Sequence, residues 1–318
     1  IIDVLRMTMY KFKDTGGKPE KLAIPPEEKE KADLLHKELI EAVAGNDETL
    51  MEKYFEKGEL DEDEIKTGMK KAMINHDLFP LFCLSAERNM GSGRLMGFID
   101  NVCPSANEMP PQGSTKGEDI GCDASKPVCA FVYKAISEPH VGELSFMKVF
   151  SGTLKSGMDL INETTGVSEK LNQLFVMEGN KRNNVSELSA GDIGATLKLK
   201  NTHVNNTLHE RNVNYALQPI EFPSPNMSIA VRTVKKGEEE KLSAALHQLR
   251  DEDPTLIVKV SSELKQTIIY CQGDMHLAVI KWKLHHQHKV DVVFEAPGIP
   301  YRETIRTAAE AVYRHKKQ

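Results

Sequence analysis

The sequence predicts a multidomain α+β protein, because three segments with different hydrophobic patterns follow one another along the chain. Residues 1–104 show mainly helical periodicity, residues 127–220 consist of short apolar runs between glycine turns, and residues 223–296 alternate between strands and helices. A chain of 318 residues is long enough for two or three domains, and its 40% of hydrophobic residues lets each one bury a core.

The first segment is predicted to be a short strand followed by helices and by a strand–loop–helix unit of the α/β type. The pair Pro25-Pro26 precedes two glutamates, which is typical of a helix start because the first turn has free N–H groups and the positive end of the dipole. The acidic run Asp61–Glu64 predicts a second helix start. We expect an apolar strand over Leu78–Ala86 and a helix over Ser92–Val102.

The second segment follows a predicted linker, residues 105–126, which is rich in Pro, Gly, Ser and Asp. Several short apolar runs with turn residues between them are typical of a β-barrel or a β-sandwich. The runs that carry this prediction are Val128–Tyr133, Leu144–Val149, Asp159–Ile161 and Ala195–Leu199.

The third segment is predicted to form a ferredoxin-like domain. Its pattern gives the element order βαββαβ, which is the order of that fold. The expected elements are a strand over Met227–Val234, a helix over Glu238–Asp251, strands over Thr255–Ser261 and Gln266–Gln272, a helix over Asp274–His288 and a strand over Lys289–Ala296.

Composition argues against several classes of function. No apolar run approaches the roughly 20 residues that span a bilayer, so no membrane partner is expected. The five cysteines are an odd number without a C-x-x-C pair, which argues against a disulfide framework and a structural zinc site. Net charge is −6, and charge alone does not indicate a nucleic acid partner. An aromatic content of 6% argues against a protein built around base stacking.

No metal ion and no catalytic residue are expected. His285, His286 and His288 lie close together, but only His285 and His288 are spaced to share a helix face. Two ligands without Cys or acidic company make a poor zinc site, so a solvated basic helix end beside Lys281 and Lys289 is preferred. The motifs G-x-S-x-G and H-E-x-x-H and a Gly-rich dinucleotide loop are absent, which argues against a free-standing enzyme.

Segments spread in order along the whole chain resemble elongation factor G, a translational GTPase. No single motif is decisive, but their common order and compatible spacing make the resemblance specific. The matching segments are Ile2–Met7, Leu84–Ala86 with Asn89 and Gly91, Phe131–Lys134, Pro139–Gly142, Val149–Gly157, Ala190–Ile193, Asp251–Thr255, His276-Leu277 and Pro300–Ile305.

Three departures from the family pattern suggest a divergent paralogue. Gly273-Asp274-Met275-His276 stands where the family usually has Gly-Glu-Leu-His, and Val204–Leu208 stands where it has Thr-Gly-Asp-Thr-Leu. Lys283 stands where the family usually has arginine, and a lysine loses the bidentate geometry of a guanidinium.

The resemblance implies five parts along the chain. Residues 1–104 would be the C-terminal part of an α/β GTPase domain with its helical insert, and residues 105–126 a linker. Residues 127–220 would be the translation-factor β-barrel (domain II), residues 223–296 the ferredoxin-like domain III, and residues 297–318 the start of domain IV. Because the chain opens mid-pattern at Ile1 without a Met, we expect it to be a piece of a longer protein.

The resemblance also implies a cytoplasmic, ribosome-bound factor that moves tRNA and mRNA after peptide transfer. Its partners would be ribosomal RNA and ribosomal proteins, including the stalk, and neither DNA nor a membrane. GTP and Mg²⁺ would be bound by the parent protein. This chain contains no G-x-x-x-x-G-K-[ST] and no Asn-Lys-x-Asp motif, so we expect it to hold no cofactor and to hydrolyse no GTP.

Candidate site residues follow from matching positions. Ser85 and Ala86 would be the remnant of the guanine-contacting loop. Cations and small residues on the barrel would contact small-subunit RNA, and a third group would face the GTPase switches. The barrel candidates are Lys148, Ser151, Gly152, Lys155 and Ser156 at a glycine-marked turn, with Lys181 and Arg182 as a second basic pair; the switch-facing candidates are Thr255, His276 and Lys283.

Other readings of the sequence stay open. A ribosomal protection protein of the tetracycline-resistance type belongs to the same superfamily, as does release factor three, against which the run Tyr301–Thr304 weighs. A protein-interaction module that docks through the acidic helices of residues 20–76 is a further alternative. The family places stalk contacts in that insert, so the last reading overlaps with the main one.

Overall fold

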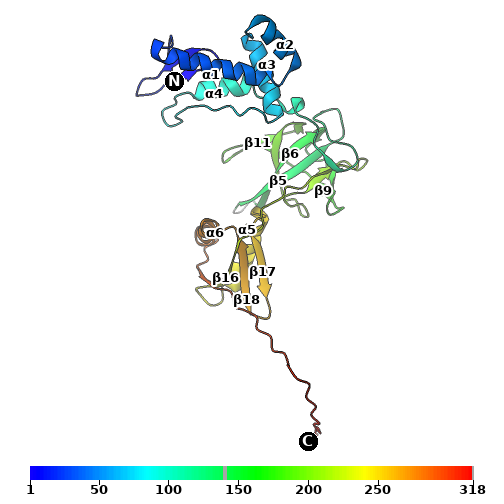
Figure 1. Cartoon of the computed structure of the whole chain (residues 1–318). Coiled ribbons are helices and arrows are strands. Elements are labelled where there is room, and N and C mark those ends of the chain that lie inside the picture. Colours follow the sequence, from blue (N-terminus) through cyan, green and yellow to red (C-terminus); the bar gives the residue numbers. More distant parts are fainter. Residues whose placement is uncertain (139–141, 317–318) are drawn as a thin grey trace. The chain divides into compact units, whose positions relative to one another are not determined.

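The computed structural model describes residues 1–138 and 142–316 (Figure 1). Contacts divide the chain into two compact units, Ile1–Pro110 and the remainder from Pro111 onward. The predicted resemblance over 139–142 falls mostly outside the described residues. No helix in the described residues is both long enough and apolar enough to cross a membrane.

The first unit combines a small antiparallel sheet with helices around a single core. The core brings together Ile40 and Val43 of the first helix, Leu50 of the second, and Ile65 and Met69 of the third. The sheet order is β1-β2-β3. The elements are β1 (Ile2–Asp3), β2 (Thr8–Lys11), β3 (Glu20–Leu22), α1 (Pro26–Ala44), α2 (Glu48–Lys57), α3 (Glu62–Ile74), α4 (Ser92–Asn101) and the short 3₁₀ helix η1 (Ala106–Glu108).

Local capping chemistry explains where these helices begin. α1 starts with Pro26 in its first turn, as predicted. α3 starts with a capping box in which the Asp61 side chain accepts from the backbone N–H of Glu64, and the Glu64 carboxylate accepts from that of Asp61. α2 was not predicted, although Asp47 caps its first turn.

The predicted strand over residues 78–86 is wrong. Within the described part of the first unit this segment joins no sheet, and its one ladder contact is a bridge between Ser85 and Met90. Phe79 and Leu81 are 81% and 93% exposed. A strand needs a neighbour that accepts its backbone hydrogen bonds, and an apolar run does not supply one. The helix predicted after it is confirmed as α4.

The barrel predicted for the second segment is confirmed as a sheet that wraps around one core. The strands follow the order β11-β10-β13-β6-β5-β14-β8-β9, and β7 pairs separately with β12. Leucines from β7, β8, β10, β12 and β14 meet in the same buried cluster. The strands are β5 (Cys129–Glu138), β6 (Gly142–Ser151), β7 (Thr153–Lys155), β8 (Asp159–Asn162), β9 (Ser168–Lys170), β10 (Leu174–Glu178), β11 (Lys181–Val185), β12 (Glu187–Ser189), β13 (Ile193–Leu197) and β14 (Thr207–His209).

A short strand pair lies beside the barrel. β4 (Ser114–Lys116), within the predicted linker, pairs with β15 (Ala216–Leu217), about 100 positions later in the chain. Ile120, also from the predicted linker, is 3% exposed and packs with Phe131 and Leu217. Part of residues 105–126 is therefore packed against the barrel.

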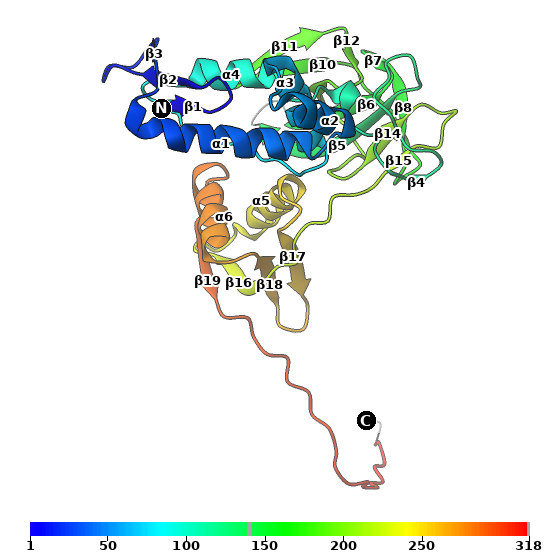
Figure 2. The same cartoon turned by 45° about the horizontal axis from the view of Figure 1, so that its top comes forward.

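The ferredoxin-like arrangement of the third segment is confirmed. Its antiparallel sheet has the order β17-β18-β16-β19, and Figure 2 shows α5 and α6 on the same side of it. Leucines of α5, Ile280 and Leu284 of α6 and Ile269 of the sheet share one core. The elements are β16 (Met227–Thr233), α5 (Glu239–Glu252), β17 (Ile257–Ser261), β18 (Gln266–Cys271), α6 (Asp274–His286) and β19 (Val292–Glu295).

Candidate functional site

Two of the predicted switch-facing residues meet at one carboxylate. Asp253, the C-cap of α5, accepts from the Thr255 hydroxyl at 2.6 Å and from the Thr255 backbone N–H at 2.9 Å. Its second oxygen lies 3.1 Å from Nε2 of His276, in the first turn of α6. The loop after α5 and the start of α6 therefore share a polar anchor.

The same contacts fix the orientation of the histidine ring. His276 Nδ1 accepts from the backbone N–H of Gln272 at 3.2 Å, which turns the other ring nitrogen, Nε2, toward Asp253. The ring is 15% exposed and the Asp253 side chain 40%. His276 is thus held in place at the edge of the domain by Gln272 and Asp253.

Lys283, the third predicted residue, binds the neighbouring carboxylate. Its Nζ donates to Oε2 of Glu252 at 2.9 Å, while Oε1 of the same group accepts from the Ser137 backbone N–H on β5 at 3.0 Å. The Glu252 side chain is only 11% exposed. Glu252 therefore ties α6 to α5 and the end of α5 to the barrel.

Two groups near the contacts of Glu252 with α6 and the barrel, here called the junction, have shifted pKa values. Burial raises the pKa of Glu143 on β6 above its usual range, and the charges of Asp251 and Glu252 add to the rise, although His203 opposes it. Burial lowers the pKa of His288, and Lys283 lowers it further while Glu252 acts in the opposite direction. Burial thus disfavours the charged form of both Glu143 and His288.

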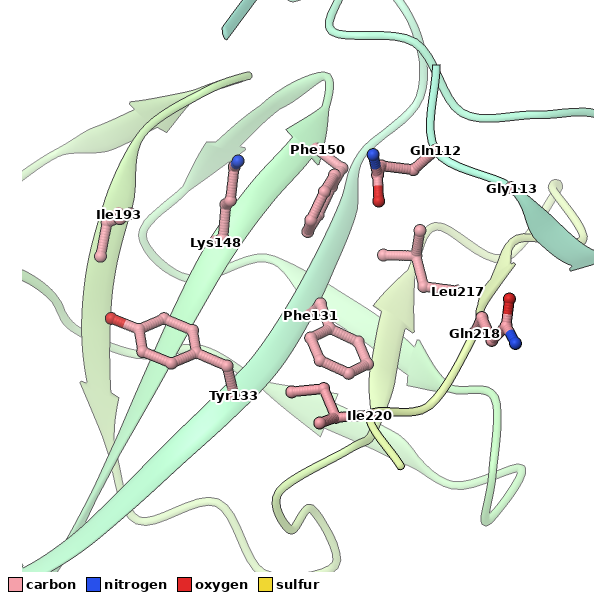
Figure 3. A pocket seen from close by; sticks show the side chains of 10 residues that line it. All are labelled: Gln112, Gly113, Phe131, Tyr133, Lys148, Phe150, Ile193, Leu217, Gln218 and Ile220. Atoms are coloured by element: carbon pink, nitrogen blue, oxygen red, sulfur yellow. The ribbon is translucent and has the colours of Figure 1, made fainter. Parts of the chain in front are cut away.

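On the barrel, Lys148 lies at a pocket of about 420 Å³. Figure 3 shows aromatic and aliphatic side chains around the pocket, with the Lys148 side chain beside the Phe150 ring, and the ammonium is 4.9 Å from the ring centroid. Phe131, Tyr133 and Phe150 supply the aromatic wall, and Gln112 and Gln218 supply amides. This pocket combines an apolar floor with one cation.

The predicted barrel turn contains both internal and exposed residues. Ser151 is 2% exposed. Gly152 has φ +77°, and a Cβ there would lie 2.6 Å from the Val128 Cα, so close backbone packing requires glycine. Lys155 and Ser156 are exposed, and the Ser156 hydroxyl donates to the Asn172 carbonyl at 2.7 Å. Lys155 therefore carries the exposed cation of this turn.

Lys181 and Arg182, the second basic pair, differ in their ion pairs and in their exposure. Arg182 forms an ion pair with Glu138 at 3.2 Å, and its side chain is 29% exposed. Lys181 is 73% exposed and lies 3.8 Å from a carboxylate oxygen of Glu178. Arg182 is thus partly committed to holding β11 near β5, whereas Lys181 extends into solvent.

Ser85 and Ala86 form a tight turn before α4. The Ser85 backbone N–H and C=O are both bonded to Met90 at 2.9 Å, and Ala86 is exposed. The Ser85 backbone N–H and C=O groups are therefore already paired within the turn. Among the residues that the structure describes, no group of three His, Cys, Asp or Glu side chains is placed to hold a metal ion.

Sequence reasoning missed the two carboxylates that organise the third domain's polar edge. Glu252 and Asp253 were included in the family match, but only Thr255, His276 and Lys283 were assigned roles. The run Asp-Pro-Thr after a helix was a usable signal, because an aspartate there commonly accepts bonds from the following turn. No local sequence pattern indicates the hydrogen bond between Ser137 and Glu252, which are 115 positions apart.

Comparison with known proteins places these features in a family. The family model for elongation factor G domain 2 matches residues 127–211, and the model for elongation factor G domain III matches residues 222–296. Elongation factor G of Thermotoga neapolitana is 36% identical over 324 aligned residues, which cover 100% of this chain and 47% of that protein. A crystal structure from Thermus thermophilus matches with a TM-score of 0.79 and 27% identity, over 95% of this chain and 43% of the other.

The barrel and the ferredoxin-like domain thus define a translation factor. More narrowly, the chain belongs to the elongation factor G family. It spans about half the length of the relative it matches.

Proposed function

We propose that this chain is a ribosome-binding portion of a cytoplasmic, elongation factor G-like protein whose full-length form binds GTP and promotes movement of tRNA and mRNA. The observation that carries the proposal is the 36% identity to elongation factor G along the entire chain. A match of that extent includes both domains and the segment before them, rather than a single reusable module.

The barrel would contribute cations to ribosomal RNA. Lys155 is exposed at the glycine-marked turn, Lys148 lies at the edge of the aromatic pocket, and Lys181 extends from β11. Lysines carried by a rigid sheet suit phosphate contacts, because the backbone sets their approach while the long side chains adapt. Ser151 and Gly152 would support that surface from inside.

The polar edge of the third domain would transmit the state of the GTP-binding part of the parent. Asp253 holds Thr255 and His276, while Glu252 holds Lys283 and the barrel backbone. Because Glu252 and Asp253 are neighbours at the end of α5, we expect a displacement of His276 to be passed on to the barrel backbone. These residues contact no phosphate themselves in the proposal, and GTP hydrolysis is assigned to residues of the parent outside this chain.

The helical insert would supply a protein contact, as the stalk prediction requires. Leu34 and Leu35 on α1 and Phe55 on α2 are 57%, 41% and 79% exposed, among many acidic residues. Exposed apolar side chains of this size can be buried by a partner protein, which would stabilise the contact. This observation favours the insert as the point where a ribosomal protein docks.

Co-sedimentation with vacant bacterial ribosomes over a salt series tests the proposal. Binding should weaken as salt rises and should be displaced by intact elongation factor G. Lys155→Glu should weaken binding several-fold and flatten the salt dependence, whereas Lys170→Glu, an exposed lysine of β9 in the same barrel, serves as the matched control. Absence of binding at low salt would refute a ribosome contact by this portion of the factor.

A further inference from the structure

The end of α6 carries the only tryptophan of the chain on the protein surface. Trp282 is 54% exposed, and one face of its indole stacks on His286, with ring centroids 4.8 Å apart and planes 20° from parallel. His285 meets His286 edge to face at 4.6 Å. The three rings form one aromatic cluster, here called the Trp282 cluster.

The Trp282 cluster does not belong to the domain core. α6 buries Ile280 and Leu284 against the sheet, while Met275, Val279 and Trp282 follow one another along its opposite side. Met275 is 80% exposed and Val279 is 49% exposed. More than half of the Trp282 surface is thus left uncovered by the domain, and this part of the ring is available to a partner.

The ring is held before any partner arrives. His286 covers one indole face, and its Nδ1 lies 3.1 Å from the Trp282 carbonyl oxygen, which limits the movement of both rings. Trp282 remains 54% exposed although His286 stacks on its ring. A fixed, open aromatic face loses little conformational entropy when a second flat ring stacks on it.

Basic residues flank the Trp282 cluster along the chain. Lys281 and Lys289 are exposed on either side of it in sequence, and Lys241 donates to the Lys289 carbonyl at 2.8 Å. Asp291 accepts from His285 at 2.6 Å; that contact is the main cause of the lowered pKa of Asp291, and Lys235 and Lys241 lower it further.

Acidic groups are present too, but most face other partners. Glu252 is bound to Lys283, and Asp291 is bound to His285. Glu239 and Glu240 lie exposed in the first turn of α5, and Glu238 precedes them. The side of the cluster formed by α6 and the turn after it is therefore basic.

We propose that the Trp282 cluster binds unpaired RNA, with one base stacked on the open face of Trp282 and the flanking phosphates bound by Lys281 and Lys289. An aromatic face accepts any base, and lysines supply the charge that such stacking needs to gain affinity. The inference deepens the proposed function, on which it rests for the source of the RNA, a single-stranded segment of ribosomal RNA. The low aromatic content of the chain excludes an extended stacking platform, and a single base requires only this one ring.

Because Trp282 is the sole tryptophan, its fluorescence reports the site directly in the unaltered chain. Titration with single-stranded oligouridylate should quench it saturably and less strongly at high salt, whereas duplex RNA of equal length should not. Binding of end-labelled oligouridylate, followed by anisotropy, should weaken about 5- to 100-fold in Trp282→Ala and less in Trp282→Phe. Met275→Ala is the matched control, since it removes an exposed apolar side chain from the same helix and should leave binding unchanged.

Several results would overturn the inference. Absence of quenching, unchanged binding in Trp282→Ala, or equal losses in Met275→Ala and Trp282→Ala would each do so, the last by showing a general apolar contact. Quenching by RNA-free ribosomal protein, with none by RNA, would assign the cluster to a protein partner. Ribosome co-sedimentation of the unaltered chain without quenching would defeat the stacking site alone, and quenching without co-sedimentation would defeat the proposed ribosome binding alone.

Discussion

Replacing Glu252 should lower the stability of the protein, because its carboxylate connects α5 with α6 and with β5 of the barrel. Removing it in Glu252→Ala leaves the Lys283 ammonium, which is 28% exposed, and the Ser137 N–H without their acceptor. A hydrogen bond to a charged group contributes about 1.5–3 kcal/mol and an unpaired backbone donor costs about 1 kcal/mol, part of which water recovers at this exposure. We therefore expect the free energy of unfolding to fall by about 2–3 kcal/mol.

Two further variants separate these contributions. Glu252→Gln keeps one acceptor oxygen but places an NH₂ group against a donor, so its loss should be about half as large. A double-mutant cycle with Lys283→Ala should give a coupling energy of about 1 kcal/mol or more for the ion pair. Glu240→Ala, which removes an exposed glutamate at the other end of α5, is the matched control and should change stability by no more than about 0.5 kcal/mol.

Chemical denaturation followed by circular dichroism measures these changes. Because Ser137 lies on the barrel and Glu252 on α5, the loss should also separate the unfolding of the two domains, which calorimetry would show as a broader or split transition. A loss below about 0.5 kcal/mol in Glu252→Ala, or equal losses in Glu252→Ala and Glu240→Ala, would refute the reasoning.

Two further predictions concern the packing of α3 and the pH response of the junction. A Cβ at Gly68 of α3 would lie 2.4 Å from Val43 Cγ1, so Gly68→Ala should destabilise the first unit by about 1–3 kcal/mol. At Gly97 of α4 nothing lies within 4 Å of such a Cβ, so Gly97→Ala should stabilise this unit by about 0.5–1 kcal/mol. Thermal unfolding tests both variants, and stabilisation by Gly68→Ala would contradict the packing argument. The raised pKa of Glu143 means that its charged form disfavours the folded state, so this cost is absent at low pH and appears as pH rises through the unfolded and then the folded pKa. Glu143→Gln should therefore raise stability at neutral pH and lose that advantage in acid, and an advantage that persists in acid would show another cause.

Local patterns predicted those elements that depend on nearby residues. The proline start of α1, the acidic start of α3 and each element of the βαββαβ order depend on residues within a few positions of one another. The strand prediction over residues 78–86 failed because pairing depends on a partner elsewhere. The pairing of β4 with β15 was not predicted for the same reason, since the two strands are about 100 positions apart.

The candidate site divides in a similar way. The sequence alone supplied the family, the domain types and the chemical identity of Thr255, His276 and Lys283. Only the tertiary structure connected these residues through Asp253 and Glu252, placed Ser151 in the interior, and stacked the exposed Trp282 on His286. Ser137 and Glu252 are 115 positions apart. Periodicity and capping act over a few residues, whereas hydrogen bonds, burial and exposure depend on which distant segments the folded chain brings within a few ångströms of each other.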